Sequence, residues 1–167
     1  MPFGEKKRWF TTGKAAAILG DWQINGNAQL ASGTPFTATV LANISDVSRG
    51  TNGTLRANYN GQPIAVSDPA VTQFFNVAAF SIPAAGTFGT AGRNTIIGPG
   101  TTVLNAGLTR NISLGPSRNL SVQVLASNLL NTVQYASIDT VVNSPTFGQV
   151  TAARPMRRVQ ILTRLRF

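Results

Sequence analysis

The few side chains that could do chemistry in this sequence do not form the patterns that catalysis or metal binding requires. Cysteine and histidine are absent from its 167 residues, which removes thiolate nucleophiles, histidine bases and the usual zinc ligands. Five carboxylates remain, and no two form a close pair on one strand face, as acid–base catalysis requires. They are Glu5, Asp21, Asp46, Asp68 and Asp139. We therefore predict that the chain is not an enzyme, with no catalytic, cofactor-binding or metal-binding residue and no cofactor.

Basic residues dominate the charge of the chain. Lysine plus arginine number 14 against 5 acidic residues, which gives a net charge of +9. That charge suits a nucleic-acid-binding protein, which is kept as an alternative. Neutralising a nucleic-acid backbone, however, requires a continuous cationic surface. Here the basic residues cluster at 6–8 and 154–166 and are otherwise scattered, so nucleic acid is not an expected partner.

Three arginines near the carboxy end have two possible roles. Arg158, Arg164 and Arg166 could line a polar lumen and attract anionic ligands. Alternatively, Arg164 and Arg166 could extend their charges to a membrane rim while their aliphatic stems cover apolar surface. The second interpretation is preferred, and the first stays open.

The segment that carries these arginines alternates between two kinds of residue. Its more apolar positions are Val159, Ile161, Thr163, Leu165 and Phe167, and the positions between them are Arg158, Gln160, Leu162, Arg164 and Arg166. A period of two predicts a strand with two different environments. The segment is as long as the roughly 9–11 residues of a tilted transmembrane strand, and longer than the roughly 5–6 of a soluble one. We expect Val159, Ile161, Leu165 and Phe167 on a lipid face.

Two further alternating segments, 103–114 and 120–127, precede this strand. The turn formers Gly115-Pro116-Ser117-Arg118 lie between them and predict a tight hairpin. Arg110 is a misfit, because it falls on the apolar side of its segment. The two strands are therefore expected to be antiparallel neighbours.

A second hairpin is predicted nearer the start of the chain. Segments 22–30 and 36–40 both alternate, and Ser32-Gly33-Thr34-Pro35 between them is rich in turn formers. Trp22 falls at a strand end, where aromatic residues form a belt at the membrane interface. This hairpin brings the expected number of long strands to about five.

The connections differ in length in a way typical of outer-membrane barrels. The two predicted turns are short, whereas segments 43–100 and 129–156 are long and rich in Gly, Pro, Asn, Ser and Thr. Such barrels have short turns at the periplasmic rim and long loops outside. With the carboxy end in the periplasm, residues 115–118 and 31–35 are periplasmic and both long segments are external. Only 11% of the residues are charged, which also suits a lipid-facing surface.

These observations predict an all-β fold. We expect an antiparallel meander of about five long transmembrane strands, forming part of an outer-membrane β-barrel with short periplasmic turns and long extracellular loops. No run approaches the roughly 18 apolar residues of a membrane helix. A soluble cell-surface or adhesin-like β protein is the alternative, because its strands are also rich in Thr, Asn and Gly.

Short motifs run through most of the chain. They are Pro2-Phe3-Gly4 at the end of an upstream strand, Gly20-Asp21-Trp22-Gln23-Ile24-Asn25-Gly26, Ser32-Gly33-Thr34-Pro35-Phe36, Phe75-Asn76-Val77-Ala78-Ala79-Phe80, Gly86-Thr87-Phe88-Gly89-Thr90-Ala91-Gly92-Arg93-Asn94, Gly98-Pro99-Gly100, Asn128-Leu129-Leu130-Asn131 and Phe147-Gly148. In this order and spacing they resemble the terminal region of TonB-dependent receptors, in particular the family with an Oar-like barrel.

The resemblance implies a function that belongs to a larger protein. Residues 1–167 would be the carboxy-terminal part of a TonB-dependent receptor barrel in the outer membrane of a Gram-negative bacterium, with the plug domain and earlier strands absent. A barrel of this kind has roughly 22 strands. The intact parent would carry out energy-coupled uptake of a scarce nutrient.

The resemblance also implies partners. Phe167 ends the chain on an alternating strand and resembles the signal read by the barrel-assembly machinery. The implied partners are outer-membrane lipid, that machinery, the remainder of the receptor barrel and, only through the missing plug, TonB.

Overall fold

The computed structural model describes residues 20–41 and 55–167. The strand end predicted at Pro2-Phe3-Gly4 lies outside these residues, as does part of the long segment 43–100. No helix in the described part of the chain has the length and apolar character needed to cross a membrane. The described chain forms two compact units. The strand unit comprises residues 20–30, 102–132 and 155–167, and the loop unit comprises residues 31–41, 55–101 and 133–154.

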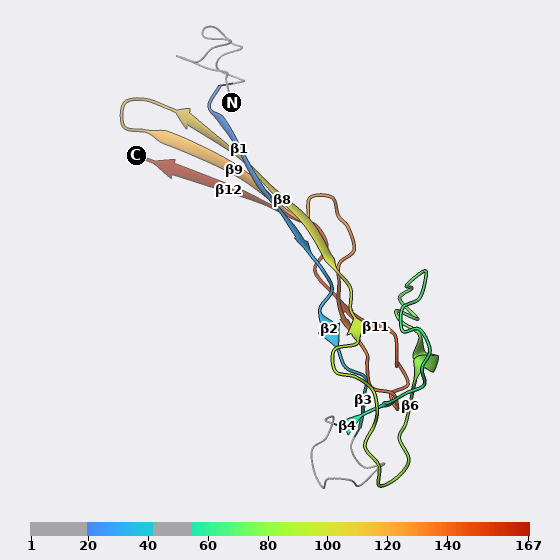
Figure 1. Ribbon diagram of the computed structural model, residues 1–167. Helices are drawn as coiled ribbons and strands as arrows, with labels where there is room; N and C mark the ends of the chain where they lie inside the picture. The colour runs from blue at the N-terminus through green and yellow to red at the C-terminus, as the bar shows by residue number, and fades with distance from the viewer. Residues whose placement is uncertain (1–19, 42–54) are drawn as a thin grey trace. The chain divides into compact units, whose positions relative to one another are not determined.

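The strand unit is a four-stranded sheet in the order β1-β8-β9-β12, and Figure 1 shows these strands side by side. Its strands are β1 Trp22–Ala31, β8 Thr101–Ser113, β9 Asn119–Ser127 and β12 Arg158–Arg166. They contain 9 to 13 residues, which is enough to cross a bilayer as tilted strands. β9 pairs antiparallel with both β8 and β12 in unbroken register. The predicted antiparallel meander of long strands is therefore confirmed.

Cross-strand pairing places residues of like character on the same face of the sheet. Ile161 lies opposite Val124, and Val124 lies opposite Leu108. Opposed residues of an antiparallel pair share a face. The apolar residues of three strands thus form one apolar face, and the residues between them form a polar face.

The described loop unit contains short strands. They are β2 Pro35–Phe36, β3 Thr39–Val40, β4 Leu55–Arg56, β5 Asn58–Tyr59, β6 Phe80–Ser81, β7 Ile96–Ile97, β10 Tyr135–Ile138 and β11 Val150–Ala153, with a 3-10 turn, η1, at Val77–Ala79. β2 pairs with β7, β3 with β4, β5 with β6 and β10 with β11, all antiparallel. Residues 36–40 are joined to the second long segment at Thr39. Its N–H donates to the carbonyl of Thr140, and its carbonyl accepts from the N–H of Val142, both at 2.9 Å.

A small hydrophobic core holds the loop unit together. Phe75 packs edge to face against Phe80 and Phe147, with ring centroids 6.0 and 5.3 Å apart. The buried residues come from both long segments and from residues 36–40: Ala38, Val40, Ala57, Phe75, Ala79, Phe80, Ala91, Ile96 and Ile138. The described parts of these segments, predicted as long loops, therefore fold into one packed unit.

The predicted hairpin between 22–30 and 36–40 is wrong. β1 pairs with β8 instead, and β2 pairs with β7. Gly33 does not turn the chain back on itself. A Cβ at Gly33 would lie 1.7 Å from the carbonyl oxygen of Gly98, so glycine is required here for the close passage of two distant segments.

The alternation at 36–40 has a different cause from that of the transmembrane strands. Ala38 and Val40 are buried in the core of the loop unit, and Phe36 packs against it. Alternating burial in a soluble core has the same period of two as a membrane strand, and here it covers two short strands, β2 and β3, and the residues between them. The described sheet therefore has four long strands rather than about five, and residues 31–35 begin a long connection rather than form a periplasmic turn.

The topology still places both long connections at one end of the sheet. Figure 1 shows β1 running opposite to β8, and β9 is antiparallel to both of its neighbours. The connections from β1 to β8 and from β9 to β12 therefore leave the same end, and residues 114–118 turn at the other. The hairpin predicted at 115–118 is confirmed, because the N–H of Leu114 donates to the carbonyl of Arg118 at 2.8 Å. This distribution is that of an outer-membrane barrel.

Candidate functional site

The apolar face of the strand unit is uncovered in the described structure. Ile161 is 71% exposed, and Val159 and Leu165 on the same face are also more than half exposed. Exposed apolar surface of this kind marks a contact with a membrane or a partner. Three of the four residues predicted for the lipid face, Val159, Ile161 and Leu165, lie on this face of β12. Phe167 follows directly after β12 and is fully accessible, and its role as an assembly signal stays a prediction.

One cation interrupts the apolar face. Arg110 lies opposite Val122, and its guanidinium carbon lies 5.3 Å from the centroid of the Trp22 ring. A cation over an indole face is attracted by the ring quadrupole. Both residues lie near the short-turn end of the sheet, where a long side chain can reach the interface. Arg110, which breaks the alternation of its strand, and Trp22, which is predicted at the rim, therefore contact each other.

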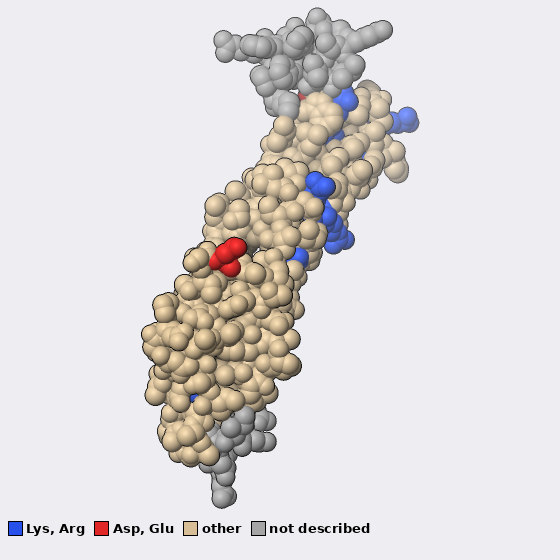
Figure 2. All heavy atoms as spheres, turned by 90° about the vertical axis from the view of Figure 1, so that its right-hand side faces the viewer, with Lys and Arg blue, Asp and Glu red and all other residues tan. Residues whose placement is uncertain are grey.

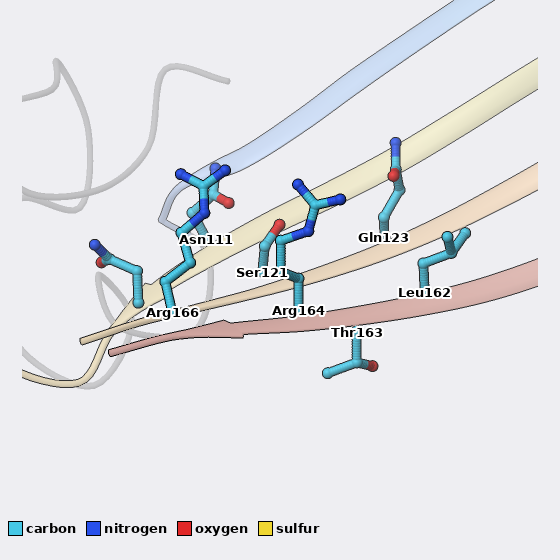
Figure 3. Close-up of a pocket in the computed structure, with 8 residues that line it drawn as sticks. Asn111, Ser121, Gln123, Leu162, Thr163, Arg164 and Arg166 are labelled. Atoms are coloured by element: carbon cyan, nitrogen blue, oxygen red, sulfur yellow. The ribbon is translucent and has the colours of Figure 1, made fainter.

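The polar face carries the three predicted arginines. Arg158, Arg164 and Arg166 lie on one side of β12, and Arg164 lies opposite Ser121. Figure 3 shows Arg164 and Arg166 pointing to the same side of the sheet, while Thr163 points the other way. The arginines thus lie on the polar face, and their two predicted roles, at a polar lumen or at a membrane rim, stay predictions.

A hollow of about 300 Å³ lies over the short-turn end of the polar face. Arg164 and Arg166 are the charged residues in it, and three strands contribute to its walls. Its lining residues are Asn111, Asn119, Ser121, Gln123, Leu162, Thr163, Arg164 and Arg166. Arg158 is at the other end of β12, opposite Ser127, and does not line it. Sequence reasoning found the arginines but not their carboxamide neighbours, because only the strand register brings them together.

Charge is concentrated on the strand unit. Six of the nine described arginines belong to it, and Asp21 is its one acid among the described residues. In the view of Figure 2 most of the visible basic side chains follow one stretch, a further one lies apart from it, and most of the described surface is uncharged. The polar face of the sheet therefore carries a net positive charge.

Asparagines join the strands at the long-connection end of the sheet. The N–H of Asn128 donates to Oδ1 of Asn105 at 3.0 Å, and Nδ2 of Asn105 donates to Oδ1 of Asn27 at 3.2 Å. Asn128 is buried with φ 50, and its side chain bonds both the N–H and the carbonyl of Thr132. A left-handed φ is tolerated by asparagine better than by most residues. The Asn128-Leu129-Leu130-Asn131 motif thus ends β9 and sets the direction of the second long connection.

The motif Phe75-Asn76-Val77-Ala78-Ala79-Phe80 forms the centre of the loop unit. Asn76 caps the 3-10 turn at Val77–Ala79, because its side-chain oxygen accepts from the N–H of Ala78 at 3.1 Å. The turn places both phenylalanines of the motif in the core. This motif is therefore structural.

The glycine-rich motif at 86–94 is also structural. The N–H of Ala91 donates to the carbonyl of Ala57 at 2.9 Å, and Nη1 of Arg56 donates to the carbonyl of Ala91 at 2.7 Å. Gly89 passes so close to the backbone that a Cβ there would lie 1.9 Å from the carbonyl oxygen of Arg56. Residues 86–94 therefore pack against residues 55–59, which contain β4 and β5.

Asp139 organises the turn that follows β10. Its carboxylate accepts hydrogen bonds from the hydroxyls of Ser144 and Thr146 and from the N–H of Val141. Partial burial raises the pKa of Asp139, but the three hydrogen bonds outweigh it and lower the pKa below the ordinary value of 3.8. The carboxylate is therefore ionised at neutral pH and stabilises the turn as an acceptor.

Protonation of Asp139 is expected to weaken the loop unit. Its folded pKa is lower than its unfolded one, so its stabilisation is present above pH 3.8 and is lost as the pH falls through the folded value. Asp139→Asn should remove this dependence and lower stability at neutral pH. Urea unfolding of the loop unit, with brief proteolysis as the readout, measures both effects when it is repeated between about pH 2 and pH 7. An identical pH profile for the variant and the wild type would contradict the assignment.

One comparison with known proteins identifies a family. A family model described as an outer membrane beta barrel domain matches residues 1–160. No curated protein and no solved structure matches the chain. The matched region includes β1, β8 and β9 and the start of β12, whose apolar face requires lipid and whose polar face requires water. A soluble cell-surface protein is not supported by this match. The chain belongs to the outer membrane beta barrel domain family and is located in the outer membrane of a Gram-negative bacterium.

Proposed function

We propose that the chain is the carboxy-terminal part of a TonB-dependent receptor that takes part in energy-coupled uptake of a scarce nutrient. The observation that carries the proposal is that both long connections fold into one packed unit with a shared core. Capture of a dilute solute is favoured by a preorganised surface, because ordering flexible loops upon binding costs affinity.

The motifs that resemble the receptor family support the proposal through their positions. Phe75 to Phe80 and residues 86–94 build the loop unit, and Phe147-Gly148 contributes an aromatic ring and a close turn to it. The motif Asn128 to Asn131 ends β9. Motifs that fix the external unit are consistent with a receptor, in which this unit would help to bind the nutrient.

The proposal includes the partners of the parent protein and the absence of catalysis. Outer-membrane lipid would contact the apolar face, the assembly machinery would recognise the strand that ends at Phe167, and further strands would pair with the open edges of β1 and β12. TonB would act only through a plug domain. Neither catalysis nor nucleic-acid binding is proposed, because the chain has no Cys or His and its basic residues cluster at 6–8 and 154–166 and are otherwise scattered.

Genetic interaction with TonB tests the proposal. We expect deletion of the gene that encodes the chain to slow growth on one limiting nutrient among iron chelates, cobalamin and glycans. In a strain without TonB the deletion should add no further defect. Complementation with the wild-type gene restores growth, and complementation with the Phe88→Ala variant should do the same because Phe88 is exposed outside the core.

Two results would overturn the uptake proposal. The first is a growth defect that adds to the defect caused by loss of TonB. The second is passive diffusion of the nutrient through the purified protein in lipid vesicles, which is the behaviour of an open pore.

A further inference from the structure

Six polar side chains line the hollow on the polar face. In the described part of the chain their side chains make no hydrogen bond and no ion pair with protein atoms. They are Asn111 on β8, Asn119, Ser121 and Gln123 on β9, and Arg164 and Arg166 on β12. Figure 3 shows the labelled members of this group on one side of the sheet. The hollow therefore offers many N–H and O–H donors to a ligand.

The charge of the hollow is positive, and no acidic side chain lines it. Arg164 and Arg166 each carry a guanidinium group, which stays protonated at any physiological pH. Asp21 is the one acidic residue described in the strand unit, and it does not line the hollow. Two neighbouring cations without a carboxylate favour an anion as the ligand.

The spacing of the two arginines selects the kind of anion. Arg164 and Arg166 are two residues apart on one strand face, which separates their Cα atoms by about 7 Å. Arg164 lies opposite Ser121 and Arg166 opposite Asn119, so each guanidinium has a neutral donor beside it in its row. A guanidinium binds a carboxylate or a phosphate through two parallel hydrogen bonds. The hollow thus has two rows, each suited to one oxyanion group.

We propose that this hollow binds a small solute that carries at least two carboxylate or phosphate groups, one at each arginine row. A volume of about 300 Å³ suits a small metabolite-sized anion. The ligating side chains extend from paired strands, which hold their positions without a loop rearrangement. The proposal rests on the barrel assignment and not on coupling to TonB, so it can fail independently of the uptake proposal.

Citrate binding by the intact protein, purified from outer membranes in detergent, tests this site. Titration calorimetry at low ionic strength should show saturable binding of citrate and weaker binding of inorganic phosphate. The double variant R164Q/R166Q should weaken citrate binding at least about tenfold, because two charge-assisted contacts are lost. Arg158→Gln is the matched control. It removes the same charge from the same strand face outside the hollow and should change the affinity by less than about twofold.

A second variant keeps the test decisive if the double variant misfolds. Ser121→Asp places a carboxylate directly opposite Arg164 and should abolish citrate binding while retaining both arginines. Absence of saturable binding of either anion to the wild type would overturn the proposal. So would an equal loss in Arg158→Gln and R164Q/R166Q, because it would show that net charge alone attracts the anion.

Discussion

Replacing Phe75 with alanine should destabilise the loop unit by about 3–5 kcal/mol. Phe75 is 2% exposed and packs its ring against Phe80 and Phe147 at the centre of a small core. Its removal leaves a cavity that so few buried residues cannot fill. Because the free energy of unfolding of so small a unit is itself only a few kcal/mol, the loop unit should be unfolded in most molecules of the variant. Protease cleavage within residues 55–101 or 133–154 of the protein on intact cells measures the effect.

Phe88→Ala is the control for this prediction. It removes the same atoms from the same unit, but Phe88 is 67% exposed and lies outside the core. Its expected effect is within about 0.5 kcal/mol. Equal protease resistance of Phe75→Ala and the wild type would show that the described core does not hold the unit together.

Replacing Ile161 with arginine should cost the barrel about 2–4 kcal/mol of folding free energy. Ile161 lies near the middle of β12 on the apolar face, opposite Val124. A guanidinium there would be placed close to the bilayer midplane, too far from either rim to reach water easily. The fraction of the intact protein that migrates as folded, without heating, across a urea series in lipid vesicles reports the change.

Gln160→Arg provides the matched control on the same strand. Gln160 lies opposite Leu125 on the polar face, so the same charge introduced there meets water rather than lipid. We expect its unfolding midpoint to stay close to that of the wild type. Loss of stability in Gln160→Arg with none in Ile161→Arg would reverse the assignment of the two faces.

The long strands could be predicted from sequence because their alternation is a local property. Apolar residues recur at every second position of β9, and the same period runs along β8 and β12 with interruptions at Arg110 and Thr163. The turn at 115–118 was predictable for the same reason, since glycine and proline act on neighbouring residues. The strand register then follows from a short connection with little freedom.

The loop unit could not be predicted because its structure depends on contacts between distant segments. The Ser32-Gly33-Thr34-Pro35 motif has the composition of a turn, but Gly33 serves a close approach to Gly98. Thr39 bonds Thr140 and Val142 across a separation of about a hundred residues. Two-residue strands carry too few positions to show a period. Local patterns therefore gave a false hairpin and left the shared core unseen.

The candidate site was predictable in part. Arg164 and Arg166 stand out in the sequence as charges in an alternating strand. Their neighbours Asn119 and Ser121 are ordinary polar residues of another strand, and nothing in the sequence pairs them with the arginines. The register between β9 and β12 places Ser121 opposite Arg164 and Asn119 opposite Arg166. Residue types thus predicted a cationic face, and the pairing of strands was needed to define a hollow on it.

The central claim, that one sheet face contacts lipid and the other water, is tested most directly by cysteine scanning. Residues 1–167 contain no cysteine, so single cysteines along residues 120–126 of β9 carry spin labels with no background from this part of the protein. In the intact protein in lipid vesicles, labels at positions 120, 122, 124 and 126 should collide mainly with oxygen dissolved in the bilayer. Labels at 121, 123 and 125 should collide mainly with a water-soluble nickel chelate. A profile without this period of two would contradict the account.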